Sequence, residues 1–116
     1  MKSGFVAALL VILAGLGQAA PTNFPKDVSD FLSRRESCDH WRSEAGYDDE
    51  RAADIAWSSC QACQGTDAQL ARLKKKYRTN AKIMEELDAL DSRIEPDDKA
   101  AAKEFCRNTR KPKWLK

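Results

Sequence analysis

Four cysteines constrain the fold of this chain more than any other feature. They are Cys38, Cys60, Cys63 and Cys106, in a chain of 116 residues. An even number of cysteines in a short exported chain is typical of a disulfide framework. A domain of this length buries only about 60 to 70% of the surface of its unfolded chain, so its core is small. We therefore predict that two disulfides hold a small fold together.

Residues 1–19 have the pattern of an export signal. Lys2 is followed by an apolar run that ends at Leu16, and Gly17 and Ala19 are small residues that suit a signal peptidase. The run is short for a membrane span, which needs about 20 apolar residues. We predict cleavage after Ala19, no stable membrane insertion of the mature chain, and a location in the periplasm or outside the cell. An uncleaved membrane anchor is the alternative.

The mature chain is predicted to be helical throughout. Proline and glycine are rare after residue 25, and no long stretch alternates polar and apolar residues. We expect an extended leader over 20–26, a helical domain over 27–108 and a basic C-terminal tail over 109–116. The fold class is all-α, a small bundle of four or five short helices pinned by two disulfides.

Capping and helix-breaking residues mark the ends of these helices. Side chains of Asp, Asn and Thr at a helix start bind its free backbone N–H groups. Glycine and proline end a helix. The expected starts are Asp27, Thr66 in a capping box with Gln69, Asn80, Asp97–Asp98, and the acidic residues Asp48, Asp49 and Glu50, whose charge meets the positive end of the helix dipole. The expected ends are a break over 44–47, Gly65 and Pro96.

Apolar residues recur with the spacing of a helix face in each segment. The strongest stripe follows the fourth helix through Ile83, Leu87 and Ile94, and we predict that this helix continues to Pro96. In the first helix, Arg35 interrupts the apolar stripe. We expect its side chain to extend along the helix and to place its charge in solvent.

The spacing of the cysteines limits how they pair. Cys60 and Cys63 lie three residues apart on one predicted helix, so a bond between them would join no two elements. We expect each of them to reach a different helix. The preferred pairing is Cys38–Cys63 with Cys60–Cys106, and the alternative is Cys38–Cys60 with Cys63–Cys106. In the chain-entropy model each of these bonds adds about 3–4 kcal/mol of stability.

The same cysteines permit two other interpretations. A redox dithiol at Cys60 and Cys63 would normally lie at the start of a helix, where the dipole lowers the thiol pKa. Here the pair lies near the end of its predicted helix. A zinc site that added Cys38 and His40 would need two ligands that point about 200° apart on one helix. A redox or metal-handling protein that uses Cys60 and Cys63 is therefore the alternative.

No residues form a recognisable catalytic constellation, and we predict that the protein is not an enzyme and needs no cofactor or metal. His40 is the only histidine. Ser58 and Ser59 lie within a predicted helix and lack the glycine-flanked turn that exposes a nucleophile. A group of carboxylates follows the expected solvent face of the fourth helix without a calcium-loop pattern. These are Glu85, Glu86, Asp88, Asp91 and Glu95.

A basic run in the third helix is the best candidate for a binding surface. The formal net charge of the chain is only +2, which does not favour nucleic acid. A local basic face still attracts an acidic partner, and tryptophan is enriched at interfaces. The residues that we predict to contact a partner are Arg72, Lys75, Lys76 and Arg78, with Trp57 or Trp114 as an anchor.

Three segments carry a resemblance to known proteins. They are 37–42 (SCDHWR), 65–70 (GTDAQL) and 75–78 (KKYR). They resemble a group of small exported bacterial proteins of unassigned function. The resemblance covers roughly residues 28–95 and includes two of the cysteines, at 38 and 63, which favours the preferred pairing.

A fainter similarity links the chain to small exported helical lysozyme inhibitors. It rests on Cys63, Asp67, Leu70 and Tyr77, and it transfers no site residues. The sequence predicts an exported, non-catalytic protein-binding module of the inhibitor or immunity type. Its expected partner is a protein in the cell envelope or outside the cell. An envelope structural or stress protein whose basic face binds anionic surfaces is a further alternative.

Overall fold

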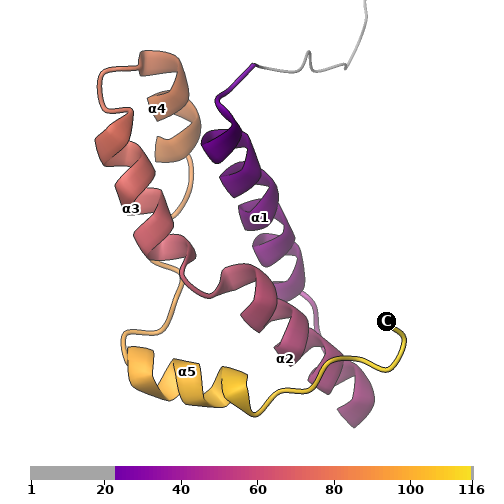
Figure 1. Ribbon diagram of the computed structural model, residues 1–116. Helices are drawn as coiled ribbons and strands as arrows, with labels where there is room; N and C mark the ends of the chain where they lie inside the picture. The colour runs from indigo at the N-terminus through magenta and orange to yellow at the C-terminus, as the bar shows by residue number, and fades with distance from the viewer. Residues whose placement is uncertain (1–22, 116) are drawn as a thin grey trace, which may run out of the picture.

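The computed structural model describes residues 23–115, so the predicted signal segment 1–19 lies outside the described residues. Within residues 23–115 all regular structure is helical, which confirms the predicted all-α fold class. Five helices follow one another along the chain (Figure 1). They are α1 (Lys26–Arg42), α2 (Asp49–Cys63), α3 (Thr66–Lys76), α4 (Ala81–Asp88) and α5 (Lys99–Arg107).

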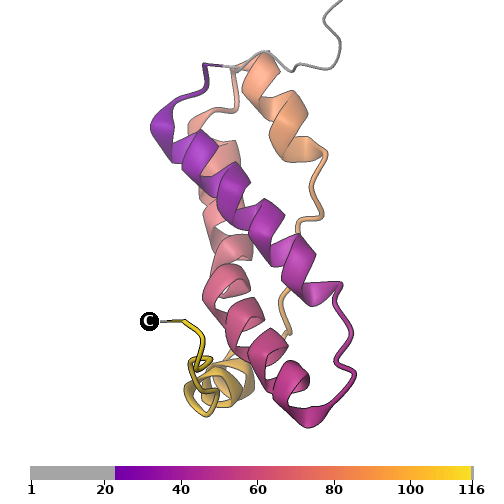
Figure 2. The same ribbon diagram turned by 90° about the vertical axis from the view of Figure 1, so that its right-hand side faces the viewer.

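The apolar core lies where α1, α3 and α4 meet. Figures 1 and 2 show α3 and α4 beside the N-terminal half of α1. α2 extends beyond the C-terminal end of α1. α5 lies at the far end of the molecule against α2, and none of its residues is fully buried. The core residues are Val28, Phe31, Leu70, Leu73, Ile83 and Leu87.

Both disulfides have the preferred pairing. Cys38–Cys63 joins α1 to α2 with 4.8 Å between the Cα atoms, and Cys60–Cys106 joins α2 to α5 with 5.6 Å. All four cysteines of the chain are bonded in this way. Two disulfides of this kind indicate an oxidising environment. Between residues 23 and 115, no helix has both the length and the apolar character needed to cross a bilayer.

Three of the predicted helix starts are confirmed, and a side chain caps each of them. In each case the carboxylate or amide oxygen of the cap residue accepts a hydrogen bond from the backbone N–H three residues later. These side chains are Asp48 at 2.8 Å, Asn80 at 3.1 Å and Asp98 at 2.9 Å. The starts of α2, α4 and α5 are therefore fixed by local sequence alone.

Two predicted caps are wrong. Pro25 occupies the cap position of α1. The carboxylate of Asp27 instead accepts hydrogen bonds from the side chains of Lys76 and Tyr77. Thr66 is buried, and its hydroxyl donates to the carbonyl of Cys63 at 2.8 Å rather than capping α3. Gly65 occupies the cap position of α3 with φ of +87°, a left-handed conformation that glycine adopts without strain.

α4 is shorter than predicted. It ends at Asp88, and an irregular connection over 89–98 replaces the expected helix to Pro96. The backbone N–H of Ile94 in this connection donates to the carboxylate of Asp67 at 3.0 Å. In a continued helix that N–H would bind a carbonyl four residues earlier. A tertiary hydrogen bond therefore prevails over the apolar spacing.

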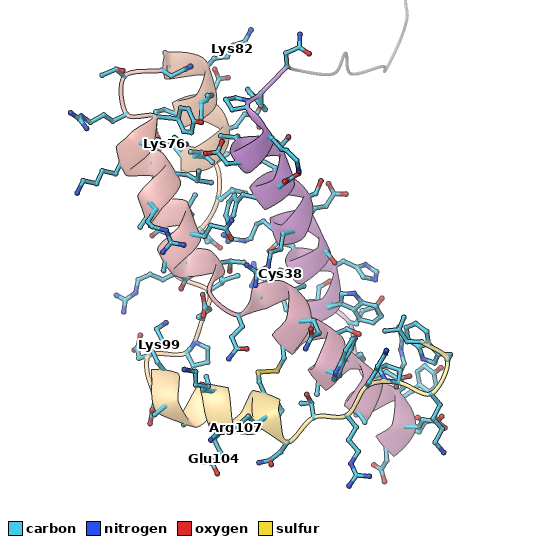
Figure 3. All side chains as sticks on the ribbon, viewed as in Figure 1. Cys38, Lys76, Lys82, Lys99, Glu104 and Arg107 are labelled. Carbon is cyan, nitrogen blue, oxygen red and sulfur yellow. A yellow bond between two sulfur atoms is a disulfide. The ribbon has the colours of Figure 1, made fainter. Side chains whose placement is uncertain are left out.

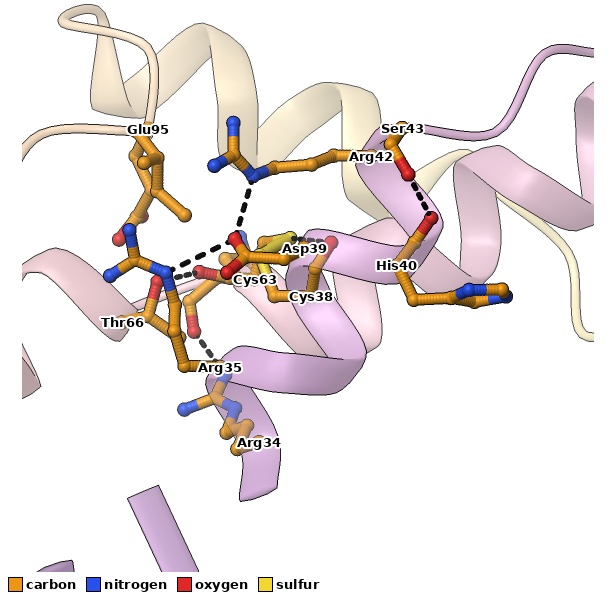
Figure 4. Close-up of a disulfide and its surroundings, with 12 residues drawn as sticks. Arg34, Arg35, Cys38, Asp39, His40, Arg42, Ser43, Cys63, Thr66 and Glu95 are labelled. Atoms are coloured by element: carbon orange, nitrogen blue, oxygen red, sulfur yellow. Dashed lines mark hydrogen bonds and ion pairs between the residues drawn. A yellow bond between two sulfur atoms is a disulfide. The ribbon is translucent and has the colours of Figure 1, made fainter. Parts of the chain in front are cut away.

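The expectation for Arg35 is also wrong. Its side chain is only 2% exposed instead of reaching solvent. Its Nη2 donates to the carbonyl oxygen of Asp91 at 2.9 Å, and its Nε donates to the carboxylate of Asp39 at 3.3 Å. The connection after α4 supplies one of these acceptors, the carbonyl of Asp91. It therefore keeps the guanidinium of Arg35 buried. Figure 4 shows Asp39 between Arg35 and Arg42, beside the disulfide.

Candidate binding surfaces

Two lysines of the basic run in α3 form ion pairs with neighbouring helices. The Nζ of Lys74 lies 3.2 Å from a carboxylate oxygen of Asp88 in α4. The Nζ of Lys76 lies 2.7 Å from a carboxylate oxygen of Asp27 in α1, and Figure 3 shows Lys76 near the end of α3. Both lysines connect α3 to a neighbouring helix. Lys76, one of the predicted partner contacts, is therefore already engaged within the chain.

The other predicted basic residues remain on the surface. Arg72, Lys75 and Arg78 are exposed, and none of them forms an ion pair within residues 23–115. Arg78 makes only a 3.4 Å contact from its Nη1 to the carbonyl oxygen of Lys75. We call these three residues the α3 cationic face. Because α3 packs its apolar side on the core, Arg72 and Lys75 have a fixed direction toward solvent, and Arg78 lies in the turn that follows the helix.

Asp27 anchors the end of α3 through two hydrogen bonds. Its carboxylate accepts from the Nζ of Lys76 at 2.7 Å and from the hydroxyl of Tyr77 at 2.8 Å. These two bonds hold the pKa of the Asp27 carboxyl below its ordinary value, and the bond from Lys76 is the larger cause. The hydrogen bond to Asp27, and after it burial, raises the pKa of the Tyr77 hydroxyl, whereas Lys76 acts in the opposite direction.

This arrangement predicts a pH-dependent stability. A lowered carboxyl pKa in the folded state stabilises the protein above the unfolded-state pKa, and this contribution is lost as pH falls through the folded pKa. Asp27→Asn should remove this part of the acid dependence. Urea unfolding between about pH 6 and pH 2 should show the wild type more stable near neutrality, with the difference shrinking below the ordinary carboxyl pKa of 3.8. Parallel pH profiles for the two proteins would contradict it.

The two predicted tryptophan anchors lie together but away from the α3 cationic face. Trp57 and Trp114 line one cavity of about 390 Å³, and Trp41 lines it as well. The indole Nε1 of Trp114 donates to a carboxylate oxygen of Asp54 at 3.2 Å. The guanidinium carbon of Arg51 lies 5.3 Å from the centroid of the Trp41 ring. These contacts gather side chains from α1, α2 and the tail.

The C-terminal tail packs on α2. Figure 1 shows residues after α5 crossing the far end of α2. Pro112 in this segment is buried, and the backbone N–H of Leu115 donates to its carbonyl oxygen at 3.1 Å. The tail therefore brings Trp114 to the cavity that the other two tryptophans line.

Asp67 and Glu95 form a reciprocal clamp that the sequence analysis missed. The carboxylate of Asp67 accepts from the backbone N–H groups of Ile94 and Glu95, both at 3.0 Å. The carboxylate of Glu95 accepts from the N–H groups of Gly65 at 3.0 Å and Asp67 at 2.8 Å. The clamp caps α3 and fixes the connection that precedes α5. Glu95 thus does not lie on the solvent face of a fourth helix.

His40 has a surface position. Its side chain is 59% exposed, and its Nε2 lies 3.4 Å from a carboxylate oxygen of Glu44. Figure 4 shows the imidazole pointing away from the disulfide. The zinc interpretation would need the thiolate of Cys38, which is bonded to Cys63. Among the residues that the structure describes, no group of three His, Cys, Asp or Glu side chains is arranged to hold a metal ion.

No family model, curated protein or solved structure matches this chain. The resemblance to small exported bacterial proteins therefore stays a prediction.

Proposed function

We propose that this protein is a non-catalytic protein-binding module of an exported, oxidising compartment. Its α3 cationic face binds an acidic surface of another protein. One observation carries the proposal. Arg72 and Lys75 are exposed without an ion pair in residues 23–115, whereas Lys74 and Lys76 beside them bind carboxylates of α4 and α1.

The anchoring of α3 supports a binding role. The clamp of Asp67 and Glu95 holds its first turn, and the bonds of Asp27 hold its end. A surface that is ordered before association loses less conformational entropy on binding. Unpaired cations on such a surface also accelerate the encounter with an acidic partner. The two disulfides support export, since such bonds persist in oxidising compartments.

Charge reversal tests the role of the α3 cationic face. The double variant Arg72→Glu with Lys75→Glu should weaken capture of the partner from an extract of the exporting cells by at least about tenfold at low salt. The wild-type interaction should weaken as salt is added, and that of the variant should depend less on salt. Its melting temperature should stay close to the wild-type value, because both side chains are exposed.

A second double variant controls for net charge. Lys99 and Lys113 are exposed and, like the first pair, form no ion pair within residues 23–115. Lys99→Glu with Lys113→Glu changes the charge by the same amount and should preserve capture within about twofold. Equal losses of capture in both double variants would show that the effect depends on net charge and not on the α3 cationic face. Binding of the wild type to anionic lipid vesicles, without a protein partner, would favour the envelope structural alternative.

A further inference from the structure

Two cavities of the structure adjoin one another. The first has a volume of about 490 Å³ and lies between α1, the end of α2 and α5. The second is the cavity of about 390 Å³ that the tryptophans line. Arg34 and Gln61 line both cavities, so the two adjoin at these side chains and are treated together as one cleft. We call it the α1–α2–α5 cleft, with a cationic end and a tryptophan end.

Arg34 is a fixed cation where the two ends meet. Its Nη1 donates to Oε1 of Gln69 at 3.1 Å, and its Nη2 donates to the carbonyl oxygen of Gln64. Both acceptors are neutral, so they orient the guanidinium without neutralising its charge. A guanidinium has five N–H donors, and those not used here remain for a ligand. This geometry suits a carboxylate, which binds arginine through two parallel hydrogen bonds.

Lys103 and Arg107 add two more cations to the cationic end. They lie four residues apart on α5, so their side chains share one face of the helix. The disulfide of Cys106 with α2 fixes that face beside the cavity. Arg107 lies 3.7 Å from Glu104, a pair in which both side chains are more than 60% exposed. Figure 3 shows Arg107 and Glu104 on α5.

The cationic end is open, and two carboxylates adjoin it, Glu104 beside Arg107 and Glu95 on the N–H of Gly65. Among its described lining residues, Arg34, Lys103 and Arg107 are charged and none is a carboxylate. A Cβ built on Gly65, which also lines this end, would meet no atom within 4 Å, so the space beside it is free. An exposed pair such as that of Arg107 contributes little energy and does not compete strongly with a ligand. The end therefore suits an anionic group.

The tryptophan end suits an apolar group. Trp41, Trp57 and Trp114 provide its aromatic surface, and Ser58 and Gln61 provide polar atoms beside it. Tryptophan and arginine are the residue types most enriched among side chains that dominate binding energy. A ligand that fills the whole cleft therefore carries an apolar side chain close to a negative charge.

We infer that the α1–α2–α5 cleft binds a short acidic segment of the partner protein. An apolar or aromatic side chain of this segment enters the tryptophan end. An Asp or Glu carboxylate within about three residues of it binds Arg34, with Lys103 and Arg107 close by. A peptide presents both groups on one chain. This inference rests on the proposed function for the nature of the partner, but its surface is separate from the α3 cationic face.

Intrinsic fluorescence gives a direct readout. The chain has three tryptophans, and all of them line this cleft. The probes are capped hexapeptides in which one Leu or Phe is followed, one to three positions later, by Asp or Glu. Matched peptides carry Asn or Gln at those positions. We expect acidic peptides to shift the emission saturably and their neutral counterparts to bind at least about tenfold more weakly.

Protein variants locate the binding. Lys103→Glu with Arg107→Glu should weaken acidic-peptide binding at least about tenfold, whereas Arg72→Glu with Lys75→Glu should leave it unchanged. If only the α3 variant abolished peptide binding, the cleft assignment would be wrong while the proposed function would stand. An oligogalacturonate, which is an acidic saccharide, serves as a further probe. If it shifted the emission and no acidic peptide did, the cleft would be assigned to an acidic saccharide instead. The absence of any fluorescence response to every peptide would overturn the inference.

Discussion

Replacing both Cys38 and Cys63 with alanine is expected to lower the free energy of unfolding by about 3–4 kcal/mol. The bond joins residues 25 apart in sequence and ties α1 to α2. Cys38 is completely buried, and alanine avoids placing a hydroxyl there. Total stability in a domain of this kind is about 5–15 kcal/mol, so the loss is a large fraction of it. Urea unfolding of wild type and variant measures the difference.

The second disulfide provides a matched comparison. Cys60–Cys106 closes a longer loop, with a sequence separation of 46, so loop entropy alone ranks it as the more stabilising bond. α5, however, contributes no fully buried residue. We expect Cys60→Ala with Cys106→Ala to release α5 while the core of α1, α3 and α4 stays folded. Hydrogen exchange should show lost protection in 99–107 alone. Loss of protection in the core of this variant would contradict the account.

Asp67→Ala is expected to destabilise the protein by about 2–4 kcal/mol. The substitution leaves two partly buried backbone N–H groups, those of Ile94 and Glu95, without their carboxylate. Each unsatisfied buried donor costs about 1–3 kcal/mol. Glu95→Ala should cost less, about 1–3 kcal/mol, because it leaves one part-buried N–H, that of Asp67, and one exposed N–H, that of Gly65, without the carboxylate. Thermal and urea unfolding of the two single variants test this.

A double-mutant cycle distinguishes a clamp from two independent caps. Because each carboxylate binds the backbone of the other residue, the double variant should lose less stability than the sum of the single variants. Asp91→Ala is the control. Asp91 lies in the same connection, but only its carbonyl oxygen contacts Arg35, so its side chain should matter by less than about 0.5 kcal/mol. Strict additivity at Asp67 and Glu95 would show that the clamp does not act as a unit.

Local signals in the sequence were sufficient for the helix starts at Asp48, Asn80 and Asp98. Each of these side chains binds an N–H only three residues away. The spacing of the cysteines excluded a bond between Cys60 and Cys63 but left two pairings open, and the resemblance to small exported proteins favoured the one observed. Fold class therefore followed from short-range patterns, whereas the covalent framework was only narrowed to two pairings.

The features that sequence analysis missed depend on distant residues. The carboxylate of Glu95 binds the N–H of Asp67, 28 residues earlier in the first turn of α3, and Arg35 binds a carbonyl 56 residues later. The same limit affects the candidate site. Lys75 and Lys76 are neighbours in an unbroken basic run, and only the contact of Lys76 with Asp27, 49 residues away, distinguishes them. Spacing along one helix contains no information about such partners.

Zero-length carbodiimide cross-linking measures the central claim most directly, because it joins lysine amines to carboxylates in contact. Cross-linking is carried out in an extract of the exporting cells and followed by peptide mapping. An internal link between Lys76 and Asp27, whose charged atoms lie 2.7 Å apart, verifies the reaction. We expect links from Lys75 to an Asp or Glu of another protein, in excess over links from Lys99 and Lys113. Equal linking at all three lysines, or internal links alone, would contradict it.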